Sequence, residues 1–80
     1  MRKQTEDFIE EHFSKEQWAT VREELLSIKE EHTMNGEYNL FNARMAALTI
    51  AKGDLGVLKV QVEQAKIDFR DVVMAAMYLK

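Results

Sequence analysis

The chain contains almost none of the residues that interrupt helices, with no proline and only three glycines among its 80 residues. Strong helix formers, such as alanine, glutamate, lysine, leucine and methionine, are common instead. A chain with so few breakers is expected to fold into helices joined by short turns. We therefore predict an all-α protein, a small bundle of about five short helices.

A chain of this length supplies one modest hydrophobic core, so residues 1–80 are expected to form a single helical domain. The sequence contains no cysteine, which excludes disulfides and thiolate metal sites. Its hydrophobic content of 46% and charged content of 31% are typical of a folded globular protein. Stability must come from packing, within one chain or shared with a second.

Two features bear on the cellular compartment. The stretch MRKQTEDFIEE turns acidic before any apolar run begins, unlike a secretory signal. The longest apolar stretch, VVMAAMYL, is too short to span a bilayer. We expect a cytoplasmic protein with no membrane partner.

The first half of the chain has clear signals for helix boundaries. A short helix is expected over residues 3–12. Ser14 and Gln17 then have the spacing of a capping box, and Phe13 and Trp18 that of a hydrophobic staple. These signals predict a second helix from Lys15 to about residue 32, which ends before a turn at residues 35–36.

Three further helices are expected in the second half. One covers about residues 39–52 and stops at Gly53, a C-cap glycine. Asp54 caps the next, over about residues 55–66, and Asp68 and Asp71 open the last. Residues 57–63 also alternate apolar and polar side chains, which leaves a strand as the alternative there.

This last third has a recognisable pattern. The stretch GDLGVLKVQVEQAKIDFRDVVMAA, about 24 of the 80 residues, resembles the C-terminal segment of short, uncharacterised bacterial helical proteins. In that segment a Gly-Asp-Leu helix start is followed by a helix opened by Asp-aromatic-Arg-Asp-Val. The resemblance implies helices at Asp54 and Asp68 and no function. The ending MYLK departs from the acidic, proline-terminated tail of the pattern.

The two histidines, His12 and His32, each follow a pair of glutamates. Residues that share a helix face are three or four apart, and no carboxylate precedes either histidine at that spacing. We therefore predict that both histidines lie at helix ends and bind no metal, and the alternative is a metal site assembled between two chains. Without a nucleophile elbow or a phosphate loop, we predict no catalytic residue, no cofactor and no enzyme activity.

Charge is divided unevenly along the chain. Residues 1–38 carry ten acidic and five basic residues, and residues 39–80 carry four and six, which gives the net charge of −3. The second half could form a helix-turn-helix, with phosphate contacts from Lys52, Lys59, Lys66 and Arg70. However, the last helix is mainly apolar and the chain is acidic overall, which argues against nucleic-acid binding.

The sequence has more apolar residues than five short helices can bury. After each helix is given one buried stripe, the residues that remain are Tyr38, Leu40, Ile50, Val57, Val60, Met77, Tyr78 and Leu79. Extended apolar patches mark partner surfaces, although these residues could also be ordinary core positions. We expect a partner surface that includes Met74, Met77, Tyr78, Leu79, Tyr38 and Leu40.

The sequence thus favours a small non-catalytic protein–protein interaction module or regulator that forms a homodimer or binds another protein. A nucleic-acid-binding protein and a small enzyme are the alternatives.

Overall fold

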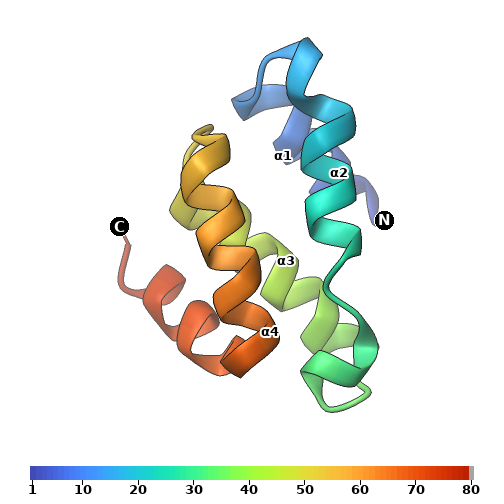
Figure 1. Cartoon of the computed structure of the whole chain (residues 1–80), viewed down its shortest axis with the longest axis vertical. Helices are drawn as coiled ribbons and strands as arrows, with labels where there is room; N and C mark the ends of the chain where they lie inside the picture. The colour runs from blue at the N-terminus through green and yellow to red at the C-terminus, as the bar shows by residue number, and fades with distance from the viewer. Residues whose placement is uncertain (80) are drawn as a thin grey trace.

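The computed structural model describes residues 1–79, which form four α-helices and two short 3-10 helices (Figure 1). In chain order these are α1 (Lys3–His12), η1 (Lys15–Gln17), α2 (Trp18–Leu26), η2 (Glu30–Thr33), α3 (Glu37–Ala51) and α4 (Leu55–Met77). Residues 1–79 contain no strand, so the alternative for residues 57–63 was wrong. The all-α prediction is confirmed, with four α-helices rather than about five.

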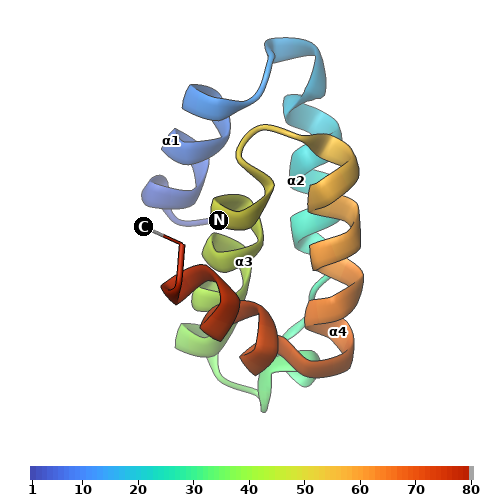
Figure 2. The ribbon, with the colours of Figure 1, turned by 90° about the vertical axis from the view of Figure 1, so that its left-hand side faces the viewer.

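The core forms around α3, which packs against α4, α1 and η2 (Figures 1 and 2). Helix α3 has buried residues on more than one face, and most of them are alanines: Leu40, Ala43, Ala46, Ala47, Leu48 and Ala51. Small side chains let the neighbouring helices approach closely. Larger side chains from α1, α2 and α4, such as Ile9, Leu25 and Leu58, are completely buried and complete the core.

The second helix is shorter than predicted and ends at Leu26 instead of about residue 32. The Arg44 side chain of α3 donates hydrogen bonds to the carbonyl oxygens of Leu25 (3.0 Å) and Ile28 (2.9 Å) at this helix end. In addition, the Ser27 hydroxyl donates to the Glu24 carbonyl at 2.6 Å. These side chains satisfy carbonyls that a longer helix would have bonded along its own backbone.

The boundary before the second helix lies where the sequence places it, but its cap differs. Ser14 has the extended backbone of an N-cap residue, yet its hydroxyl makes no capping hydrogen bond, and a 3-10 turn, η1, precedes α2. Phe13 is buried, and the Trp18 indole N–H donates to its carbonyl oxygen at 2.9 Å. Phe13 and Trp18 are therefore linked by a hydrogen bond to the backbone, and the bond expected from Ser14 is not formed.

Two short turns flank α3. Before the helix, Met34 and Asn35 both have positive φ, which confirms a tight turn near the predicted residues 35–36. After it, Lys52 and Gly53 have φ of 49° and 86°. A Cβ atom on Gly53 would overlap the carbonyl oxygen of His12, so this turn packs against the end of α1.

Helix α4 contains both of the last two predicted helices. Asp54 caps it as expected, because its Oδ1 accepts a hydrogen bond from the Val57 amide at 3.0 Å. At Asp68 the backbone is not helical (φ −153°, ψ 95°), and the Asp68 carboxylate accepts a bond from the Arg70 amide at 3.1 Å. The predicted helix start at Asp68 is thus a kink, beyond which residues 69–77, here called the C-terminal limb, turn back in a hook (Figure 2).

Candidate functional site

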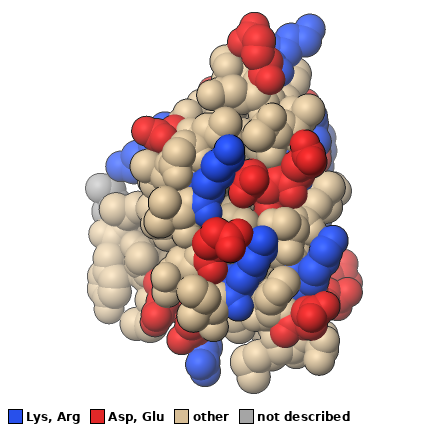
Figure 3. Space-filling model, viewed as in Figure 1, with Lys and Arg blue, Asp and Glu red and all other residues tan. Residues whose placement is uncertain are grey.

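The C-terminal limb and the turn after it expose a cluster of large apolar side chains. Met74, Met77, Tyr78 and Leu79 have exposed fractions between 42% and 79%. The opposite side of the limb is buried, since Phe69 and Val72 belong to the core. Among the described residues, the tan area at the left edge of Figure 3, where Figure 1 places the limb, shows few Lys, Arg, Asp or Glu side chains. We call these four residues the terminal apolar surface.

The other two predicted interface residues lie elsewhere. Tyr38 is 66% exposed, but it lies on the first turn of α3. Leu40 is only 9% exposed and belongs to the core, so its assignment to a partner surface was wrong. The alanine-rich α3 is covered on several sides, which gives Leu40 a buried place outside the single stripe that the spacing suggested.

Four exposed apolar residues, Met1, Leu26, Met34 and Ile67, were not identified from the sequence, and the last two are the most exposed of them. Ile67 is 80% exposed and follows Val57 and Val60 along one side of α4, while Met34 is 71% exposed in the turn before α3. The spacing of the buried Leu58, Val62 and Ala65 already placed Ile67 outside the core stripe. This position outside the core stripe was the sequence signal from which the exposure of Ile67 could have been predicted.

Neither histidine takes part in a group of metal ligands, because residues 1–79 contain no cluster of three or more histidine, aspartate or glutamate side chains able to hold an ion. His12 ends α1 as predicted, and its ring lies 4.1 Å from that of Phe8. His32 lies in η2 rather than at the end of a long helix. Its Nδ1 accepts a hydrogen bond from the Lys29 amide at 2.8 Å.

Several charged residues are paired within the chain. Arg22 on α2 contacts two carboxylates of α1, Glu6 at 2.6 Å and Glu10 at 3.7 Å. Two of the basic residues considered for phosphate contacts also have acidic partners: Lys66 pairs with Glu63, and Arg70 with Asp68. Figure 3 shows basic and acidic side chains interleaved across the visible face, rather than one basic area.

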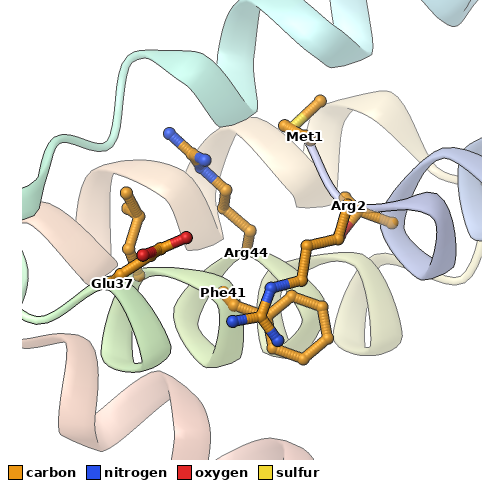
Figure 4. A pocket seen from close by; sticks show the side chains of 7 residues that line it. Met1, Arg2, Glu37, Phe41 and Arg44 are labelled. Carbon is orange, nitrogen blue, oxygen red and sulfur yellow. The ribbon is translucent and has the colours of Figure 1, made fainter.

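A small cavity of about 270 Å³ lies between the start of the chain and the first half of α3 (Figure 4). Its lining residues are Met1, Arg2, Thr5, Glu37, Leu40, Phe41 and Arg44. The Arg2 guanidinium carbon lies 4.3 Å from the centre of the Phe41 ring, in a cation–π contact. Two arginines and one glutamate therefore line a single cavity.

Arg44 is the most constrained of these groups. Burial lowers the pKa of its guanidinium, and the charge of Glu30 opposes this effect. An arginine keeps its proton at any physiological pH, so the side chain remains a partly desolvated cation.

A second, more open hollow of about 320 Å³ lies beside the α4 kink and is lined by His32, Met34, Ile67, Asp68, Phe69 and Arg70. It combines the exposed Met34 and Ile67 with charged groups from the kink.

Comparison with known proteins identifies no relative, since no family model, curated protein or solved structure matches the chain significantly. Within residues 1–79, no helix has the length and apolar character needed to cross a membrane.

Proposed function

We propose that this protein is a non-catalytic interaction module that forms a homodimer through the terminal apolar surface. The observation that carries the proposal is the exposure of Met74 and Met77 on the C-terminal limb and of Tyr78 and Leu79 directly after it. Burial of apolar area contributes roughly 25 cal/mol per Å². Four such side chains therefore supply a strong drive to associate.

A second copy is the occupant that fits best. A two-fold interface must be self-complementary. The acidic residues 1–38 and the more basic residues 39–80 give each copy both signs of charge, so antiparallel copies can place opposite charges together. The chain also lacks disulfides, and a small fold of this kind gains stability by burying more surface in a dimer.

The interaction proposal accounts for more of the molecule than its alternatives do. The interleaved charges of the visible face suit protein contacts better than a phosphate backbone, which favours continuous basic surfaces (Figure 3). The cavity beside α3 is below the usual range of roughly 300 to 1,000 Å³ for ligand pockets, and the hollow beside the α4 kink, at about 320 Å³, is at the lower end of that range and more open.

Substitution of the terminal apolar surface tests the proposal. In the double variant Met77→Ser and Tyr78→Ser, dimerisation should weaken at least about tenfold, because two large contacts are lost. Light scattering over a concentration series measures the change. The matched control is Val60→Ser with Ile67→Ser, which removes two exposed apolar side chains from the part of α4 before the kink at Asp68.

The control should leave the dimer intact. If only the control variant loses the dimer, the interface lies on the part of α4 before Asp68. If neither variant loses it, the proposed surface is contradicted.

A further inference from the structure

We infer that the cavity beside α3 is a binding site for a small carboxylate, held by Arg44 and Arg2. This site is independent of the terminal apolar surface. It combines a partly buried arginine that has hydrogen-bond donors to spare, a second arginine held against an aromatic ring, and a cavity large enough for a small carboxylate.

Arg44 supplies the first half of the site. Its guanidinium carries five N–H groups, and the two hydrogen bonds to Leu25 and Ile28 use one on Nε and one on Nη2. Nη1 makes no hydrogen bond, and since no fully buried side-chain nitrogen in residues 1–79 lacks a partner, Nη1 is at least partly accessible. Because those two bonds hold the guanidinium in place, its remaining donors are positioned before a ligand arrives.

Arg2 supplies the second half. Its guanidinium stacks on Phe41 at 4.3 Å, which orients the planar group while leaving its edge able to donate hydrogen bonds. In Figure 4 the Arg2 guanidinium lies over the ring, and Arg44 extends toward the end of α2. The two cations reach the cavity from different elements, the chain start and α3.

Charge and size select the kind of anion. The charged groups of the lining residues are the guanidinium groups of Arg2 and Arg44, the α-amino group of Met1 and the carboxylate of Glu37, and their positive sum suits an anion. A carboxylate carries one negative charge at neutral pH, whereas phosphate carries about 1.5 to 2 and would be repelled more strongly by Glu37. The volume of about 270 Å³ accommodates a group the size of acetate or a glutamate side chain.

Glu37 gives the proposal its sharpest consequence. In the view of Figure 4, its carboxylate lies between the two guanidinium groups, and within residues 1–79 it forms an ion pair with neither of them. A bound carboxylate would share this region with Glu37 and be repelled by it. Neutralising Glu37 should therefore strengthen binding, whereas neutralising Arg2 should weaken it.

The test is an NMR titration of the full chain with sodium acetate at constant ionic strength, adjusted with sodium chloride. Acetate should cause saturable shifts of the Arg2 and Arg44 side-chain N–H signals, with a Kd on the order of 1 mM, consistent with so small a ligand. Arg2→Gln should weaken binding about tenfold, the loss expected for a charge-assisted hydrogen bond. Glu37→Gln should tighten it about threefold.

Arg70→Gln is the matched control, because Arg70 is an exposed arginine outside this cavity, and it should leave the Kd unchanged. A short peptide with one glutamate identifies the source of the ligand: binding as tight as acetate indicates a side chain of a protein, and weaker binding indicates a free acid. Non-saturable shifts, equal binding by Arg2→Gln, or tighter binding of inorganic phosphate than of acetate would overturn the inference.

Discussion

Individual residues determine how the turns of this fold close. Gly53 has positive φ, and its backbone passes so close to the carbonyl of His12 that no side chain fits. The preceding Lys52 also has positive φ, but it is exposed. Two neighbouring residues therefore both have positive φ and differ in the space around them.

This difference predicts opposite outcomes for two substitutions. Gly53→Ala should destabilise the fold by about 1 to 3 kcal/mol, because it adds both backbone strain and an overlap with His12. Lys52→Gly should cost nothing, since glycine relieves the strain of the left-handed conformation. Urea unfolding compares them, and equal effects of the two substitutions would contradict the proposed packing of this turn on α1.

The two helix caps lead to a second prediction at this scale. Asp54→Ala should cost about 1 kcal/mol, because its side chain accepts a bond from the Val57 amide. Ser14→Ala should cost less than about 0.5 kcal/mol, because the Ser14 hydroxyl makes no such bond. Thermal or urea unfolding of each single variant is sufficient, and a larger loss for Ser14→Ala would show that its cap forms in solution.

At the scale of helices, signals in the local sequence predicted where helices start better than where they end. Asp54 was recognisable because an N-cap depends on residues next to it in sequence. The end of α2 was not recognisable, because the group that caps it, Arg44, comes from another helix. Likewise, Leu40 is buried by helices distant in sequence, whereas the exposed Met77 and Tyr78 could be identified from the excess of apolar residues alone.

The role of Arg44 can be measured by removing its head group. Arg44→Met keeps an unbranched apolar stem but leaves the carbonyls of Leu25 and Ile28 without this donor, so we expect a loss of about 1 to 3 kcal/mol. Arg70→Met is the control, since Arg70 forms only an exposed pair with Asp68 and should contribute less than about 1 kcal/mol. Equal losses in urea unfolding would show that Arg44 does not stabilise the end of α2.

At the scale of the whole molecule, the alanines of α3 explain why apolar side chains remain outside. They allow a tight core in a structure whose extents are only 32, 24 and 20 Å, and this core has little space for further large residues. The C-terminal limb buries Phe69 and Val72 and exposes its other apolar side. Self-association through that side is the central proposal for this protein.

Sedimentation equilibrium of the unmodified protein tests this proposal most directly. Across a series from low to high micromolar concentration, the apparent mass should rise from the 9.3 kDa of one chain to twice that value and then stop. A mass that stays at 9.3 kDa at high micromolar concentration would contradict the homodimer.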